Sequence, residues 1–206
     1  MPTTDNDEMS QKSFEETLEI VRTANSVPKD CPLNYKSSNF KKEYAKLSGM
    51  ICFNSVQYYT YLSGIYRKEP KGLVQDTPAM CKCFINVDPK VKIMTDAALR
   101  AIEPGHALIF YGVDINGAPN PPSACHVAHA MISLGKGVAM GSNNGQLGLG
   151  GNWLEANIAD LVEFAADGAV TVTSNKNRLG YLFSNLLRYS LCNCDPTCTC
   201  KTLPKT

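Results

Sequence analysis

The 206-residue sequence predicts a single α+β domain, on the basis of three observations. Helical periodicities come first along the chain, strand-like stretches begin near residue 106, and no internal repeat is visible. Helices grouped ahead of a sheet are typical of α+β folds, and a chain of this length can build one hydrophobic core. We therefore expect a folded domain over 13–190, preceded by a disordered N-terminus at 1–12 and followed by a cysteine-rich tail at 191–206.

Three helices are predicted in the N-terminal part of the chain. The stretch SFEETLEIVRTA opens with Ser13 and Glu16 at the spacing of a capping box and carries its apolar residues on one face. A second helix is expected at 40–47, with Asn39 as its cap. In GMICFNSVQYYTYLSG the apolar positions again recur at helical spacing, which predicts a third helix that begins at or just before Cys52.

The remaining elements are predicted to build the sheet. Residues 65–93 contain Gly, Pro and few periodic apolar positions, so we expect a loop there, followed by a short helix at 95–102. HALIFYGV, HVAHAMISL and VAMGSN read as successive antiparallel strands, the last two joined by a GKG turn. Asn152 and Glu155 are predicted to cap a further helix, and AVTVTS to form another strand. The apolar stripe of that helix would consist of Leu154, Ile158, Leu161, Val162 and Ala165.

Charge and hydropathy exclude several classes of partner. Twenty Lys and Arg against nineteen Asp and Glu leave a net charge of +1, which gives no electrostatic basis for nucleic acid or an anionic membrane as main partner. Apolar stretches such as HALIFYGV are far shorter than the roughly 20 residues that cross a bilayer, so no membrane span is expected. The start MPTTDNDEMSQKS is acidic and polar, which is unlike a cleavable secretion signal.

Nine cysteines make the redox compartment an open question. Four of them form CNCDPTCTC, in which each C-x-C pair is too close for an ordinary internal bridge. The segment suits disulfides to distant cysteines in an oxidising space, or a structural zinc or copper(I) ion elsewhere. Because the spacing is tighter than that of zinc knuckles, bridges are favoured and no metal site is predicted.

A cysteine and a histidine are the candidates for chemistry. A thiol at the first turn of a helix faces unpaired N–H groups and the positive end of the helix dipole, so the position of Cys52 favours the thiolate. Of three histidines, His126 and His129 lie in the strand-like run CHVAHAMISLG, where an imidazole needs a partner. Strand alternation places the two on opposite faces, so only one can point at the cysteine helix.

The predicted hairpin brings a polar group beside His129. A three-residue GKG loop puts His129 opposite Asn143, and a two-residue Gly-Lys turn puts it opposite Ser142. Either an amide or a hydroxyl would then lie beside the ring, where it could fix the tautomer and orientation of the imidazole.

These segments resemble the NlpC-type and CHAP-type cell-wall peptidases and amidases, which are papain-like cysteine hydrolases. CFNSVQYYTYLSG resembles the helix that carries their nucleophile, PGHALIFYG resembles their P-G-D-L-V-F-F strand, and HAMISLGKGVAMGS resembles H-V-G-I-Y-L-G-N-G-x-x-I-H. The segments follow one another in the same order as in the family, and the resemblance covers roughly residues 49–144. It implies a papain-like fold, with N-terminal helices packed on a small antiparallel sheet.

The resemblance also implies roles for individual residues. Cys52 takes the position of the nucleophile, and His129 takes that of the base because it lies six residues before Gly135, as in the family. The family's second histidine would fall near Ser142, so Asn143 becomes the candidate for the third, orienting residue, with Asn144 behind it. No cofactor is expected. The candidates for contacts with the substrate are Ser142, Asn144 and Trp153.

The predicted activity is cleavage of an amide bond, in peptidoglycan stem peptides or a protein substrate. Many cysteines without a recognisable signal suit a secreted antibacterial effector toxin that acts in the periplasm or in another cell, with an immunity or inhibitor protein as a further partner; a cytoplasmic location is the alternative. A glutamine deamidase or transglutaminase-like toxin acting on a host protein would use the same residues. The third alternative is an inactive cysteine-rich binding module, in which Ile51 and Phe53 replace the family's usual Asp and Ser beside the nucleophile.

Overall fold

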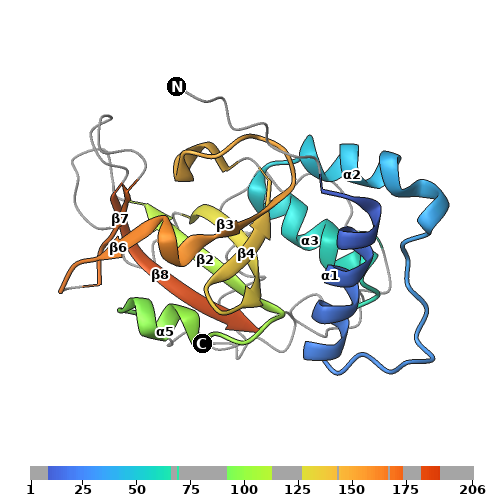
Figure 1. Ribbon diagram of the computed structural model, residues 1–206, viewed down its shortest axis with the longest axis horizontal. Coiled ribbons are helices and arrows are strands. Elements are labelled where there is room, and N and C mark those ends of the chain that lie inside the picture. Colours follow the sequence, from blue (N-terminus) through green and yellow to red (C-terminus); the bar gives the residue numbers. More distant parts are fainter. Residues whose placement is uncertain are drawn as a thin grey trace, which may run out of the picture.

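The computed structural model describes residues 9–65, 69, 92–112, 127–142, 144–166, 168–173 and 182–190. These residues form an antiparallel sheet with helices on both of its sides, which confirms the predicted α+β class (Figure 1). The α-helices are α1 (Gln11–Ala24), α2 (Phe40–Ser48), α3 (Cys52–Leu62) and α5 (Asp96–Arg100). The 3-10 turns used below are η3 (Asn144–Leu147) and η4 (Ile158–Asp160).

The sheet contains eight strands in the order β5-β4-β3-β2-β8-β7-β6, with β1 paired to β8, and every pair is antiparallel. The strands are β1 (Lys92–Ile93), β2 (His106–Gly112), β3 (Val127–Gly135), β4 (Val138–Gly141), β5 (Leu154–Asn157), β6 (Val162–Phe164), β7 (Val170–Val172) and β8 (Leu182–Ser190). The sequence predicted β2, β3, β4 and β7 at these positions. It assigned no element to β8, which lies between β2 and β7.

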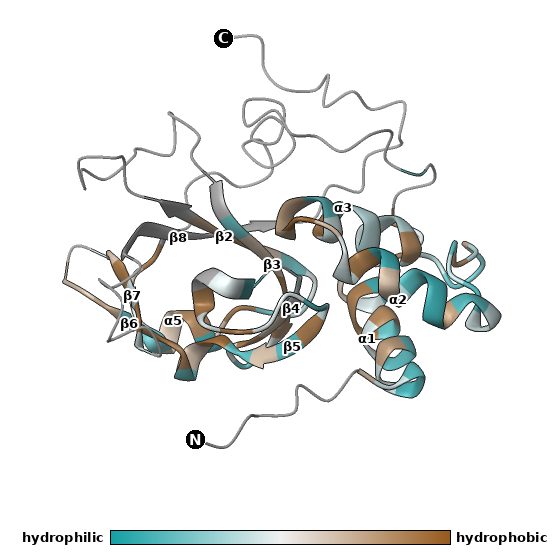
Figure 2. Cartoon of the chain, turned by 90° about the horizontal axis from the view of Figure 1, so that it is seen from above, coloured by the Kyte–Doolittle hydropathy of each residue, from teal (hydrophilic) through white to brown (hydrophobic). Residues whose placement is uncertain are grey.

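Two hydrophobic cores lie on opposite faces of the sheet. Helices α1, α2 and α3 gather beside one face, and α5 lies away from them beside β6 and β8 (Figures 1 and 2). Alternate residues of β2 and β3 enter different cores, as strand geometry requires. Ala107, Ile109, Ala130 and Ile132 belong to the core on the side of α1–α3, whereas Leu108, Phe110 and Met131 belong to the core on the side of α5.

Helix α1 begins earlier than predicted. Its N-cap is Ser10, whose hydroxyl accepts the N–H of Ser13 at 3.1 Å, so the helix starts at Gln11 and the predicted cap Ser13 lies inside it. The observed cap Ser10 and its partner Ser13 are three residues apart, as are the predicted pair Ser13 and Glu16. The backbone of Ser10 is extended, as is usual for an N-cap. Two residues assigned to the N-terminal segment 1–12 are therefore helical.

The other early helices agree with the prediction. Helix α2 begins at Phe40 as expected and ends at Ser48, one residue later than predicted, but Asn39 makes no side-chain capping hydrogen bond. Helix α3 begins at Cys52, and the side chain of Thr95 caps α5 by accepting the N–H of Ala98 at 3.1 Å. All residues from Cys52 to Thr60 are buried, because α3 lies between β3, β4 and α2. Helix α3 is thus the central helix of the structure.

The helix predicted after Asn152 is wrong, because this segment forms β5, η4 and β6. Strand β5 pairs along β4 from Val138↔Asn157 to Gly141↔Leu154, and these ladder bonds satisfy the backbone that a helix would have satisfied internally. Burial alternates along β5, and the apolar residues that resembled a helical stripe enter the α5-side core from separate short elements. Tertiary pairing therefore overrides the local periodicity.

The β3–β4 hairpin has its own turn. The loop consists of Lys136 and Gly137, with φ of 55° and 82°, and therefore lies one residue later than the predicted two-residue Gly-Lys turn. An irregularity between Ser133 and Gly135 then brings the strands into the pairing Ile132↔Met140, which is the register expected for the three-residue loop.

Candidate active site

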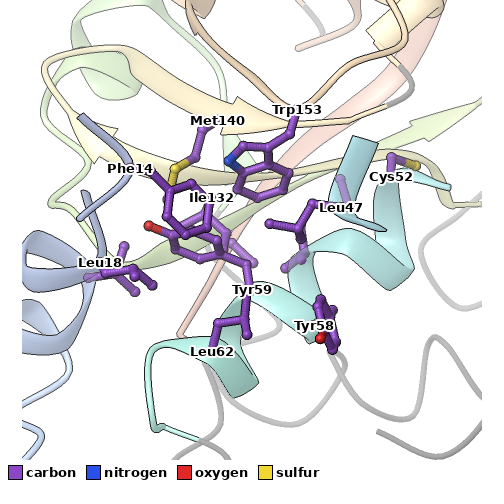
Figure 3. Close-up of a cluster of buried hydrophobic side chains, with 14 of the residues drawn as sticks. Phe14, Leu18, Leu47, Cys52, Tyr58, Tyr59, Leu62, Ile132, Met140 and Trp153 are labelled. Atoms are coloured by element: carbon purple, nitrogen blue, oxygen red, sulfur yellow. The ribbon is translucent and has the colours of Figure 1, made fainter. Parts of the chain in front are cut away.

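Cys52 occupies the first position of α3, at the edge of the helix-side core. The preceding residue Ile51 has extended backbone and provides no side-chain cap to the start of the helix. Figure 3 shows the sulfur of Cys52 directed away from the labelled aromatic and aliphatic side chains around Trp153. Cys52 is 9% exposed, so it is buried and only a small part of the residue reaches solvent.

Burial dominates the acidity of Cys52. It raises the pKa of the thiol above its ordinary value, although backbone N–H groups of Ala130, Phe53 and Cys52 itself point at the sulfur and act in the opposite direction. The expectation that the helix start would yield a thiolate is therefore wrong for this state. The amide contribution is present as expected, and desolvation outweighs it.

His129 lies in β3 and is fully buried. Its ring packs against that of Phe110, its cross-strand partner in β2, with the ring centroids 5.8 Å apart. Burial lowers the pKa of His129 to about 4, while the hydrogen bond with Asn144 acts in the opposite direction. The imidazole is therefore neutral at physiological pH.

Asn144 determines which ring nitrogen of His129 carries the proton. The amide nitrogen Nδ2 of Asn144 donates to the carbonyl oxygens of Gly141 at 3.0 Å and Asn152 at 3.3 Å. The amide oxygen Oδ1 consequently faces His129, 3.0 Å from Nε2. Because Oδ1 can only accept, Nε2 of the neutral ring donates and the lone pair lies on Nδ1. This assignment follows from the hydrogen-bond network.

The nitrogen Nδ1 of His129 is buried and has no hydrogen-bond partner among the described residues. An unsatisfied buried acceptor lowers the stability of the fold by on the order of 1–3 kcal/mol. Its presence in a folded protein therefore needs a structural or functional explanation. A basic lone pair held at a fixed orientation is what a general base requires.

The sulfur of Cys52 contacts β3 at the backbone of Ala130, the residue after His129, and the N–H of Ala130 points at this sulfur. Ala130 faces the α1–α3 core together with Cys52, whereas the imidazole of His129 lies on the other face of β3, against Phe110 of the α5-side core. A β-bulge interrupts the pairing of β2 and β3 here, since Phe110 pairs with His129 and Tyr111 pairs with Val127. Bulges redirect side chains and are frequent beside active sites. The thiol and the imidazole make no hydrogen bond to each other in this state, so closer approach is needed before a proton can pass between them.

The glycine-rich segment after β4 folds around Asn144. The N–H of Asn144 donates to the carbonyl of Gly150, and its own carbonyl accepts the N–H of Leu149, both at 3.2 Å. Leu147 is fully buried in the α5-side core and anchors the segment. This loop therefore lies next to His129 and holds the asparagine that orients the imidazole.

Ser142 and Trp153 connect the site to the residues just before α3. The hydroxyl of Ser142 donates to the carbonyl of Met50 at 3.0 Å, and the N–H of Trp153 donates to the hydroxyl of Ser48 at 3.0 Å. Trp153 is fully buried and stacks on Tyr59 with ring centroids 4.9 Å apart (Figure 3). Both side chains hold the framework of the site in this state, and their contact with a substrate stays a prediction.

Several predicted residues fall outside the described part of the chain. Asn143, the preferred orienting residue, is one of them, and so is His126. Among the described residues the hydrogen-bond partner of His129 is its sequence neighbour Asn144, which the prediction placed second. The CNCDPTCTC segment also lies outside the described residues, so its pairing stays a prediction.

Within the described ranges, the side chains offer no alternative reaction centre based on a metal. No group of three or more His, Cys, Asp or Glu side chains is arranged to hold an ion there. Cys31 and Cys52 are both free thiols. None of the helices in these ranges has the length and apolar character that crossing a membrane requires.

Comparisons with protein-family models, curated proteins and solved structures found no match to this chain. Its function is therefore inferred from the chemistry of Cys52, His129 and Asn144.

Proposed function

We propose that this protein is a papain-like cysteine hydrolase that cleaves an amide bond. Cys52 is the nucleophile, His129 is the general base, and Asn144 orients the imidazole. The observation that carries the proposal is the free lone pair on Nδ1 of a neutral histidine, whose other nitrogen is fixed by Asn144. This arrangement has the three parts of a nucleophile–base–orienter unit.

The acid–base properties favour a neutral resting pair. The raised pKa of Cys52 and the lowered pKa of His129 both disfavour a thiolate–imidazolium ion pair. As the sulfur attacks the substrate carbonyl, an S–C bond forms and the thiol proton passes to Nδ1 of His129. The imidazolium then gives this proton to the leaving nitrogen as the C–N bond breaks, which leaves a thioester on Cys52.

Hydrolysis of the thioester restores the pair. Nδ1 of His129 removes a proton from water, and the resulting hydroxyl attacks the thioester carbonyl. The S–C bond breaks, the proton returns to the sulfur, and a carboxylic acid product leaves. The oxyanion of each tetrahedral intermediate would accept hydrogen bonds from the first backbone N–H groups of α3. No side chain caps this start of the helix.

The substrate class follows from the sequence resemblance to cell-wall peptidases and amidases. We propose peptidoglycan stem peptides in the periplasm or in another cell, with an immunity or inhibitor protein as the partner that protects the producing cell. Removal of ammonia from a glutamine side chain of a host protein uses the same steps with a different leaving group. The two substrates are therefore distinguished by product and not by mechanism.

The test compares wild type with Cys52→Ala on purified cell wall. Wild type is expected to release muropeptides, detected by chromatography and mass spectrometry, and Cys52→Ala to release none. Cys31→Ala is the matched control, because Cys31 is the other free thiol of the described residues and lies far from the start of α3 in sequence. Ammonia release from a glutamine-bearing protein, without muropeptides, would move the substrate to the second class. Activity that survives in Cys52→Ala would contradict both.

A further inference from the structure

A groove of about 600 Å³ runs along α2 toward the start of α3. Its walls come from one face of α2, from Gly49 directly after that helix, and from Asn152 in the loop before β5. It therefore lies between the residues that lead into Cys52 and the loop that holds Asn144.

The groove and the candidate site share a fixed wall. The carbonyl of Asn152 accepts Nδ2 of Asn144 at 3.3 Å, and Asn144 in turn holds His129. Two hydroxyls of α2 fasten the next residue of this wall. The hydroxyl of Tyr44 donates to the carbonyl of Trp153 at 2.7 Å, and Ser48 accepts the N–H of Trp153 at 3.0 Å. Because these hydroxyls are engaged, they hold the groove's shape and are not its ligand-binding groups.

Lys41 is the one charged side chain among the described residues that line the groove. It is exposed, and none of the ion pairs formed by the described residues involves it. Lys46, one turn further along α2, differs because its ammonium already pairs with Glu69 and lies over the ring of Tyr58. Among the described residues, the groove therefore has one positive charge without an ion-pair partner, and it lies at the end remote from Cys52.

We propose that this groove binds the part of the peptide substrate that extends away from the scissile bond, and that Lys41 selects a carboxylate on it. The proposal rests on the function proposed above. Lys41 precedes Gly49 by eight residues, which is about 12 Å of helix rise. An extended peptide covers that distance in about four residues. The selected carboxylate therefore lies at least about four residues from the bond that is cut, because Gly49 is the end of the groove nearer to Cys52.

Binding is measured on the Cys52→Ala chain, which holds peptide without turning it over. The probes are a fluorescein-labelled alanine peptide with one glutamate and the same peptide with glutamine, followed by fluorescence anisotropy. An exposed ion pair predicts about two- to fivefold tighter binding of the glutamate peptide. This preference should disappear when Lys41→Gln is added, and near 1 M salt, where the Debye length is about 3 Å.

Lys42→Gln is the matched control, because Lys42 is the exposed neighbour outside the groove lining and its removal changes net charge equally. It should leave the preference intact. Equal losses in Lys41→Gln and Lys42→Gln, no preference at all, or no binding by about 1 mM peptide would each overturn the proposal.

Cleavage separates this inference from the proposed function. With the active chain, mass spectrometry of the products should place the cut at a fixed position, four or more residues from the glutamate, and Lys41→Gln should raise KM without changing kcat. If hydrolysis depended on Cys52 but were equally efficient for the glutamate and glutamine peptides, the groove assignment alone would be rejected. A glutamate preference in binding without any hydrolysis would reject the catalytic assignment alone.

Discussion

The amide oxygen of Asn144 lies 3.0 Å from Nε2 of His129, and the amide nitrogen of the same residue is engaged with two backbone carbonyls. Asn144 is therefore locked in one orientation, and it locks the tautomer of the imidazole in turn. The basic nitrogen Nδ1 has no hydrogen-bond partner among the described residues, and the N–H of Ala130, the next residue along β3, points at the sulfur of Cys52. Removing or altering Asn144 should consequently change catalysis through His129.

Asn144→Ala is expected to lower kcat about a hundredfold with little change in KM, because a positioned general base contributes about 10²–10⁴-fold. Asn144→Asp keeps an acceptor for Nε2 and should retain part of the activity. Its carboxylate would also raise the pKa of His129. In wild type the acid limb of kcat/KM should lie near pH 4, where His129 becomes protonated and can no longer accept the thiol proton.

The measurement is the pH profile of kcat/KM for wild type and both variants. Asn144→Asp should move the acid limb to higher pH, which a purely structural role of Asn144 would not do. An acid limb near the ordinary histidine value in wild type, unmoved by Asn144→Asp, would contradict the assignment of His129 as the base.

The burial of His129 also makes stability depend on pH. The unfolded chain binds a proton at His129 near pH 6.5, whereas the folded chain resists this until about pH 4. The contribution of the neutral ring is therefore complete above pH 6.5 and is lost as the pH falls toward 4. The free energy of unfolding should decrease by roughly 3 kcal/mol across this window on account of His129 alone.

Urea unfolding at several pH values measures this effect. His129→Gln cannot titrate, so the difference between wild type and His129→Gln isolates the contribution of the imidazole from that of the carboxylates. Parallel stability curves for the two proteins between pH 6.5 and 4 would show that His129 is not buried as a neutral ring.

The start of α3 and the histidine strand were predictable from sequence because each depends on a short local pattern. Helical spacing places the beginning of a helix at Cys52, and a turn-forming GKG fixes the hairpin that contains His129. Choosing between the two adjacent asparagines required more than strand register. Asn144 reaches the imidazole from η3, beyond the end of β4, so the pairing arithmetic could not identify it.

The error after Asn152 has the same origin. Apolar residues there satisfy a helical period, but their backbone lies along β4, and only the fold reveals that this edge is open for pairing. The expected thiolate at Cys52 failed for a related reason, since a sequence shows the helix start and does not show how deeply the sulfur is buried. In both cases the sequence shows the local pattern correctly. Contacts with residues distant in sequence then determine the secondary structure after Asn152 and the pKa of Cys52.

Gly137 provides a direct test of that corrected segment. Its φ is +82°, and a Cβ at this position would lie 2.6 Å from the Cβ of Ala159 in η4. The N–H of Ala159 also donates to the carbonyl of Gly137 at 3.2 Å, so the hairpin turn and η4 are in close contact. If the predicted helix ran through Ala159, this residue would not contact Gly137. Gly137→Ala is therefore expected to destabilise the protein by about 1–3 kcal/mol, through backbone strain and this clash together.

Gly151→Ala is the matched control, because a Cβ added at Gly151 would meet no atom within 4 Å. It should leave the unfolding midpoint almost unchanged, since surface substitutions away from special features usually stay within about 0.5 kcal/mol. Thermal and urea unfolding of both variants provide the comparison. Equal stability of Gly137→Ala and Gly151→Ala would show that the turn does not contact η4 closely. The path of the chain from β5 to β6 would then have to differ from that in the structure.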